Sequence, residues 1–345
     1  MTVSDLKVKI KSGSAPGWYV LCGEEEYLKR YYRNEIKKLI CAEDDPFAVF
    51  NYAQIDGADF NITAFSEAIK APPMMSDYKL IEWRFAELSK LKEKELGELI
   101  SLAEEKSDYP YATVVITALP EGFDIGTPKR PSKLYTRLSK VFDIISFEKS
   151  TDSQLLSWLN RHFKAEGIEA SLDVLNALIM RVGHSMQTLS FEVEKLSAYA
   201  KANEKSSVSV SDVEEITSAS IECDAFAISN SIIEKNVEKA FLALADMKQQ
   251  RIEAGAAIAQ LSRTYADLMS IALFIEEGRN AHDIAAIMNF HPYKLGLYTA
   301  AAKKLGAKKI SESLSALIKA DAASKAGGIS GYEAVEIFIT QNIGR

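Results

Sequence analysis

The turn after the first apolar run is where this sequence could hold a phosphate-binding site. Residues 17–22 predict a buried strand, and the helical spacing of residues 24–40 predicts a helix directly after it. A phosphate loop at such a turn needs several glycines, a lysine for the phosphates and a hydroxyl for magnesium. Here Gly23 is followed by three glutamates beginning with Glu24 and Glu25, whose carboxylates compete with phosphate for the positive helix end. We therefore expect that this turn does not bind nucleotide and that its glutamates form an acidic helix start.

No other pattern in the chain predicts a catalytic centre or a metal site. The β run at residues 111–119 ends without the acidic pair that holds magnesium in ATPases, and no GxSxG serine motif occurs. The histidines form no HExxH pair, and Cys22, Cys41 and Cys223 are too far apart for a disulfide framework or a cysteine-rich zinc site. We therefore expect no catalytic residue, no metal and no cofactor. The odd cysteine count fits a reducing, cytoplasmic compartment.

A proline-stiffened apolar loop lies between a predicted helix and a predicted strand. Residues 70–77 are Lys-Ala-Pro-Pro-Met-Met-Ser-Asp, and the prolines exclude a helix interior. Pro73 is followed by Met74 and Met75, whose flexible thioethers suit adaptable apolar contacts. Burying one such side chain at an interface is worth about 1.5–3 kcal/mol. Two interpretations stay open from the residues alone: the methionines bind a partner, or they fold back onto their own sheet.

Residues 283–294 resemble the core of a helix-turn-helix motif, followed by a helix that carries Lys303 and Lys304. This arrangement would suggest DNA contact, with the lysines facing a phosphate backbone. The face of the second helix is mostly alanine and leucine, so helix packing is the favoured interpretation. Charge runs of this size are more often a solvated surface. A DNA-binding protein of the helix-turn-helix type is kept as an alternative.

Composition is typical of a folded protein without a strongly basic surface. The 345 residues are 47% hydrophobic and 26% charged, and 41 basic against 48 acidic residues give a formal net charge of −7. This balance gives no chain-wide footprint for nucleic acid, although it is compatible with a local basic patch. No apolar run is long enough to span a membrane, and residues 1–14 lack the apolar region of a secretory signal.

The first region, residues 1–148, alternates predicted strands with predicted helices. This alternation predicts a parallel sheet with helices on both faces. The predicted strands span residues 17–22, 47–55, 78–83, 111–119 and 141–147, and the predicted helices span residues 24–40, 61–70, 87–102 and 132–139.

The rest of the chain predicts helices only, apart from short polar linkers. Residues 149–217 predict a small helical module with capping boxes at Thr151–Gln154 and Ser211–Glu214. Residues 218–345 have helical periodicity throughout, interrupted at glycines such as Gly306. The predicted fold class is therefore α/β plus all-α, in three domains.

The order of these pieces resembles the DNA polymerase III delta subunit family of bacterial clamp loaders over nearly the whole chain. Segments 19–28 and 71–80 resemble its opening strand and turn and its apolar loop, and segment 183–196 resembles its Gly, Leu and Glu-x-x-Lys-Leu pattern. Asp224-Ala-Phe and residues 321–328 resemble its C-terminal markers. The resemblance implies an AAA+-like domain with a degenerate nucleotide site, then a small helical lid domain, then a helical collar domain.

The resemblance also implies a mechanical role within the polymerase holoenzyme. In this family the loop before the third strand inserts apolar side chains into a pocket of the sliding clamp, the beta subunit, and the ring is held open for loading onto primed DNA. By position, Pro73 and Met74 correspond to the inserting residues and Met75 is their neighbour, although the family more often has an aromatic residue here. The collar would pair with the gamma or tau and delta prime subunits. An active AAA+ ATPase is the other alternative.

Overall fold

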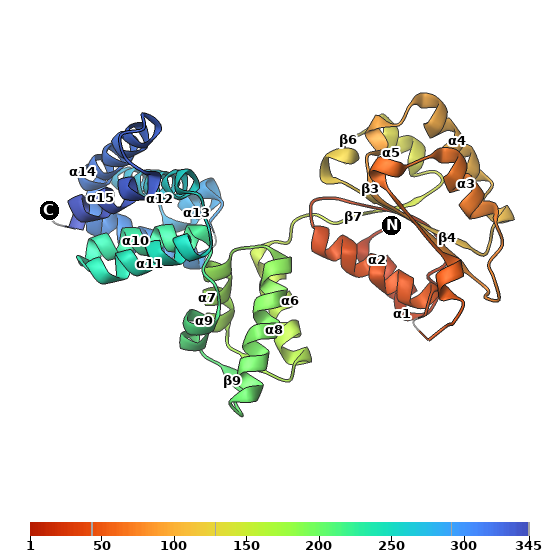
Figure 1. Cartoon of the computed structure of the whole chain (residues 1–345), viewed down its shortest axis with the longest axis horizontal. Helices are drawn as coiled ribbons and strands as arrows, with labels where there is room; N and C mark the ends of the chain where they lie inside the picture. Colours follow the sequence, from red (N-terminus) through yellow and green to blue (C-terminus); the bar gives the residue numbers. More distant parts are fainter. Residues whose placement is uncertain (43, 128, 291, 344–345) are drawn as a thin grey trace. The chain divides into compact units, whose positions relative to one another are not determined.

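The computed structural model describes residues 1–42, 44–127, 129–290 and 292–343. The chain forms two compact units, Met1–Ser150 and a second one from Thr151 onward (Figure 1). The first unit contains the sheet and the second is almost entirely helical. Among the described residues, no helix combines the length and the apolarity that crossing a lipid bilayer requires.

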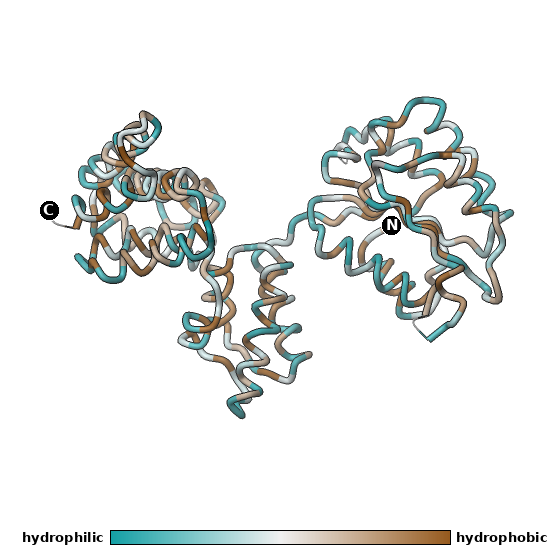
Figure 2. Tube along the Cα trace, viewed as in Figure 1, coloured by the Kyte–Doolittle hydropathy of each residue, from teal (hydrophilic) through white to brown (hydrophobic). Residues whose placement is uncertain are grey.

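The first unit is built on a five-stranded parallel sheet. The strand order is β2-β3-β4-β1-β7, and all neighbouring strands pair in parallel. Strands β1 and β4 are buried along their whole length, which explains their unbroken apolar sequences. Figure 2 shows this concentration of hydrophobic residues on the central strands. The strands are β1 (Trp18–Cys22), β2 (Tyr52–Asp56), β3 (Lys79–Ala86), β4 (Ala112–Ala118) and β7 (Asp143–Ser146).

Helices cover both faces of this sheet, as the sequence predicts (Figure 1). Helices α1 (Val3–Lys11) and α2 (Glu26–Ile40) cover the face that contains Tyr19 and Leu21. Helices α3 (Ile62–Lys70), α4 (Glu93–Glu104) and α5 (Lys133–Leu138) cover the face that contains Val20. The helices that follow β1 and β4 thus lie on opposite faces, and the carboxyl ends of these strands form a topological switch point, where ligands bind in open α/β sheets.

Two predicted elements of this unit are wrong in part. The first half of the predicted strand 47–55 is the 3-10 helix η1 (Ala48–Asn51), and only its second half is strand β2. The Asp45 carboxylate accepts a hydrogen bond from the Phe47 N–H at 2.8 Å, so a side chain satisfies this backbone locally instead of a neighbouring strand. The predicted helix 87–102 is likewise divided into η3 (Leu88–Lys90) and α4.

The remaining short elements of the first unit connect these layers. They are η2 (Gly57–Asp59), η4 (Lys106–Asp108), η5 (Pro120–Gly122) and a small antiparallel pair, β5 (Gly126–Thr127) with β6 (Arg130–Pro131).

The second unit begins with the small helical module. The capping box at Thr151 and Gln154 opens its first helix, as predicted. The second predicted box is wrong, because Ser209 is the N-cap and its partner at the third helical position is Asp212. The elements are α6 (Asp152–Ala165), β8 (Glu169–Ala170), α7 (Leu172–Val182), α8 (Met186–Ala202), β9 (Ser207–Val208) and α9 (Val210–Ile216).

Six further helices share one apolar core around Leu261, Tyr265 and Phe338. The long helix α14 is broken at Gly306, whose backbone has φ +74° and ψ +153°, so the predicted interruption is confirmed. The helices are α10 (Ile221–Glu234), α11 (Val237–Gln249), α12 (Ala254–Glu276), α13 (Ala281–Met288), α14 (Pro292–Lys325) and α15 (Gly331–Ile343).

Candidate functional site

The turn after β1 lies at the switch point of the sheet, but contacts within the chain close this turn to a ligand. Gly23 has φ +98°, and a Cβ at this position would lie 2.4 Å from the carbonyl oxygen of Phe147. The Glu25 N–H donates a hydrogen bond to that same oxygen at 2.9 Å, and the Phe147 N–H donates to Cys22 at 2.8 Å. A backbone amide that a phosphate loop would direct at its ligand is therefore used within the protein.

Lys29 occupies the carboxyl end of β4 beside this turn. Its side chain is fully buried, and its ammonium donates to the carbonyl of Ala118 at 2.9 Å and pairs with Glu26. Because a buried ammonium needs such partners, the Lys29 ammonium stays bound to the end of the sheet. Glu24 pairs with Lys149 at 3.1 Å. These contacts are those of a structural helix start.

Neither a metal-binding cluster nor an activated thiol is found among the residues that the structure describes. Within the described ranges, no group of three or more His, Cys, Asp or Glu side chains could hold a metal ion. Burial raises the pKa of the Glu25 carboxyl. It raises the pKa of the Cys22 and Cys223 thiols to about 11 and also raises that of Cys41. These thiols are therefore poor nucleophiles at neutral pH.

The apolar loop lies at the opposite end of the strands, just before the amino end of β3. Met74 is 50% exposed and Met75 is 78% exposed, while Pro73 is partly buried. Met75 also has φ +52°, a left-handed conformation that is unusual for a residue with this side chain. The interpretation in which the two methionines pack onto their own sheet is therefore wrong for this structure.

A buried asparagine that precedes β2 fixes the backbone of this loop. Asn51 is 1% exposed. Its amide nitrogen donates to the Met74 carbonyl at 2.8 Å, and its amide oxygen accepts from the Met74 N–H at 2.7 Å. At the base of the loop, the buried Lys79 ammonium donates to the Ala71 carbonyl at 2.9 Å. The methionine side chains therefore project from a backbone that is held at its tip and at its base.

The segment that contains Asn51 also exposes two apolar side chains that sequence reasoning missed. Val49 is 74% exposed and Phe50 is 63% exposed, both on η1. Their apolar character favoured a buried strand in the sequence, but the Asp-Asp-Pro run at residues 44–46 is a turn signal that could have identified an irregular segment.

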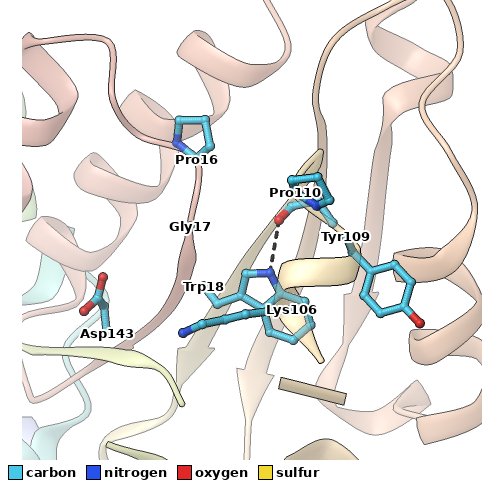
Figure 3. Close-up of a pocket in the computed structure, with 8 residues that line it drawn as sticks. Pro16, Gly17, Trp18, Lys106, Tyr109, Pro110 and Asp143 are labelled. Atoms are coloured by element: carbon cyan, nitrogen blue, oxygen red, sulfur yellow. Dashed lines mark hydrogen bonds between the residues drawn. The ribbon is translucent and has the colours of Figure 1, made fainter. Parts of the chain in front are cut away.

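A pocket of about 200 Å³ lies at the same end of the sheet, near the amino ends of β1, β4 and β7 (Figure 3). The Trp18 indole N–H donates to the Ala112 carbonyl at 3.1 Å, shown as the dashed line in Figure 3. The Lys106 ammonium donates to the Val141 carbonyl at 2.8 Å, and Asp143 pairs with a lysine of α1 at 3.0 Å. These polar groups are engaged within the protein, so the pocket carries no functional assignment here.

The lysines of the helix-turn-helix alternative lie on α14. Lys303 and Lys304 are exposed. Earlier in the same helix, Tyr298 is buried in the helical core and Lys294 pairs with a glutamate of α10. A recognition helix needs its first turns free to reach base edges. His291, which belongs to the predicted motif, lies outside the described residues.

Two family models match this chain. The model of the DNA polymerase III delta subunit matches residues 19–145, which contain the sheet and the apolar loop. The model of the C-terminal domain of the same subunit matches residues 222–342, which contain the final helices.

Curated relatives and a solved structure extend the match to nearly the whole chain. DNA polymerase III subunit delta of Bacillus subtilis is 21% identical over 348 residues, covering 99% of this chain and 97% of the relative. A probable delta subunit of Aquifex aeolicus is 26% identical over 234 residues, covering 66% of this chain and 62% of the relative.

One solved structure that matches this chain is a clamp-loader protein. The DNA clamp loader delta protein of Bacillus subtilis matches with a TM-score of 0.61 at 20% identity, over 99% of this chain and 100% of that one. This likeness shows the fold, in which a parallel sheet precedes a helical part. Together with the two family models and the Bacillus subtilis relative, it means that the chain belongs to the DNA polymerase III delta subunit family.

Proposed function

We propose that this chain grips the sliding clamp, the beta subunit, through Pro73, Met74 and Met75 and holds the ring open for loading onto primed DNA. The observation that carries the proposal is the exposure of both methionines on a loop whose backbone is bonded to buried Asn51. A soluble protein gains no stability from such a placement, whereas an interface needs a few apolar anchors that fill a partner's pocket.

The ordered backbone of this loop favours a high affinity for the clamp. Binding costs less when the binding segment is already ordered, because less conformational freedom is lost on association. Two methionines buried in a clamp pocket contribute about 1.5–3 kcal/mol each. Ring opening then follows if the loop binds the open clamp more tightly than the closed one, because a ligand shifts an equilibrium only by its differential affinity.

The closed turn at Gly23, Glu24 and Glu25 supports a role without ATP hydrolysis by this chain. The Glu25 amide and the Lys29 ammonium both bind backbone carbonyls of the protein itself. In this proposal the other loader subunits bind and hydrolyse ATP, and this chain acts through binding alone.

We further propose a division into a clamp-binding domain at residues 1–148, a lid domain at residues 149–217 and a collar at residues 218–345. The collar would join the gamma or tau and delta prime subunits. Its exposed apolar side chains support this role, among them Leu242 at 58% and Ile318 at 62% exposure. The exposed Lys303 and Lys304 are candidates for phosphate contacts with primed DNA inside the assembled loader.

A pull-down with the clamp of the same organism tests the gripping step. The double variant Met74→Ala, Met75→Ala should lose clamp binding while its circular dichroism spectrum stays that of the wild type. Met74 is half exposed and Met75 is mostly exposed, so the fold depends little on these side chains. Clamp capture at the wild-type level by this variant would remove the loop from the mechanism.

A further inference from the structure

The segments that precede β2 and β3 lie side by side at the amino ends of these strands. Strands β2 and β3 are parallel neighbours with Tyr52 opposite Leu80, so their amino ends are about 5 Å apart. Two sets of side-chain bonds join the segments beyond the strands. Asn51 binds both backbone polar groups of Met74, and the Ser76 hydroxyl donates to the Asp45 carboxylate at 2.9 Å.

Both segments expose apolar side chains next to these bonds. Val49 and Phe50 directly precede Asn51 and are 74% and 63% exposed, and Met74 and Met75 are 50% and 78% exposed. The two segments therefore form one surface, which we call the paired-loop surface and define as residues 47–51 and 73–76. Clustered exposed apolar side chains of this kind mark interaction sites on soluble proteins.

We propose that Val49 and Phe50 form a second anchor for the sliding clamp, adjacent to the methionine loop. This inference rests on the proposed function and names further residues of the same interface. Because Asn51 couples the two segments, a clamp surface that receives Met74 is brought against the segment that carries Phe50. Phenylalanine contributes a large apolar area at low cost in side-chain freedom, which suits an anchor.

The chemistry of the receiving surface follows from the same segments. The carboxylates of Asp44 and Asp77 are exposed at the borders of the paired-loop surface. An interface places its apolar anchors at the centre and its polar groups at the rim. The clamp region that fits is therefore an apolar pocket whose border is neutral or basic.

Affinity measurements with the full-length chain and the clamp of the same organism test this inference. Val49→Ser with Phe50→Ser should weaken clamp binding about 10- to 100-fold or more, since the loss of one anchor of this size alone accounts for that range. The matched control is Phe191→Ser on α8, because Phe191 is 59% exposed, nearly as much as Phe50. This control should bind the clamp with wild-type affinity.

The variant Phe50→Leu should bind the clamp with most of the wild-type affinity, because it keeps an apolar side chain at this position. Thermal melting should show all of these variants to be folded, since the side chains that they change are exposed. A Phe50→Leu affinity as weak as that of the serine variant would overturn an anchor role that rests on apolar burial.

A parallel measurement on Met74→Ser with Met75→Ser separates failure of this inference from failure of the proposed function. Loss of binding in the methionine variant but not in the Val49 and Phe50 variant overturns the second anchor and leaves the proposed function standing. Wild-type binding by both variants overturns the proposed function as well. Normal clamp binding with defective assembly of the loader would assign Val49 and Phe50 to another subunit and also overturn the inference.

Discussion

The side-chain amide of Asn51 binds both backbone polar groups of Met74, at 2.7 Å and 2.8 Å. This pair joins two segments that are 23 positions apart in sequence and precede neighbouring strands of the sheet. It explains how a loop with two exposed methionines keeps a defined shape. It also makes Asn51 a positioning residue, since it is buried and its effect on a partner acts through Met74.

Replacing Asn51 should therefore weaken clamp binding without removing an anchor. Asn51→Ala leaves the Met74 N–H and carbonyl without their side-chain partners, and a lost buried hydrogen-bond partner costs about 1–3 kcal/mol. We expect a lower free energy of unfolding and a weaker clamp affinity, both measured on the full chain. Asn203→Ala is the matched control, because Asn203 is exposed and bonds only within its own helix end. Unchanged clamp affinity in the Asn51 variant would show that loop order is irrelevant to binding.

Gly23 should not tolerate a side chain. Gly23→Ala places a Cβ 2.4 Å from the Phe147 carbonyl oxygen in a backbone with φ +98°. The left-handed backbone alone costs about 1–2 kcal/mol for a residue other than glycine, and the close contact adds to this. Chemical denaturation should show the loss. Gly97→Ala on α4 should instead stabilise the chain by about 0.5–1 kcal/mol, since a Cβ there meets nothing within 4 Å.

Nucleotide should not bind to the isolated chain. Titration calorimetry with ATP and magnesium is expected to give no heat of binding, because Glu25 and Lys29 use their donors on the carbonyls of Phe147 and Ala118. Lys29→Met should lower the free energy of unfolding by about 1–3 kcal/mol, since the Ala118 carbonyl loses its partner. Micromolar ATP binding by the wild type, abolished by Lys29→Met, would contradict the structural assignment of the turn.

Asp224 should make the stability of the chain depend on pH near neutrality. Burial, and then the charge of Asp246, raises its pKa to about 7, while Arg181 and the Gln250 amide act in the opposite direction. The folded state then binds the proton more tightly than the unfolded state, so stability falls as pH rises from about 4 to about 7. Asp224→Asn should be more stable than the wild type at pH 8, and this advantage should shrink toward pH 4.

Asp212 provides a control of opposite sign for that pH measurement. Hydrogen bonds from Lys205 and Ser209 lower its pKa to about 2, so its charged form is the one that stabilises the fold. That contribution is present above about pH 4 and is lost as pH falls toward 2. Asp212→Asn should therefore be less stable than the wild type at both pH 5 and pH 8. A pH profile of Asp224→Asn that follows the same pattern would contradict the raised pKa of Asp224.

Much of the fold was predictable because local signals agreed with the tertiary structure. The centre of strand β4 (Ala112–Ala118) has only apolar and β-branched residues, and the Asn61 side chain accepts hydrogen bonds from the first turn of α3. Two of the wrong predictions concern segments in which a side-chain hydrogen bond overrides the local sequence pattern. Ser209 caps α9 in place of Ser211, because the Ser209 hydroxyl and the Asp212 carboxylate bind each other's N–H groups.

The interaction surface was predictable only in part. The Pro73–Met75 segment stands out in the sequence because two adjacent methionines follow the prolines of a predicted loop. Val49 and Phe50 resembled part of a strand, and the role of Asn51 depends on a contact with Met74, far away along the chain. A bond between segments that become neighbours only through the β2–β3 pairing leaves no local signal in either one.

The distance across one subunit interface of the clamp ring tests the central claim most directly. A clamp labelled with a donor and an acceptor dye on the two sides of an interface should lose energy transfer when the full-length chain is added without nucleotide. The variant Met74→Ala, Met75→Ala should leave energy transfer unchanged at the same concentration. High transfer in a saturated complex with the wild-type chain would contradict the account, because the clamp would then be bound and still closed.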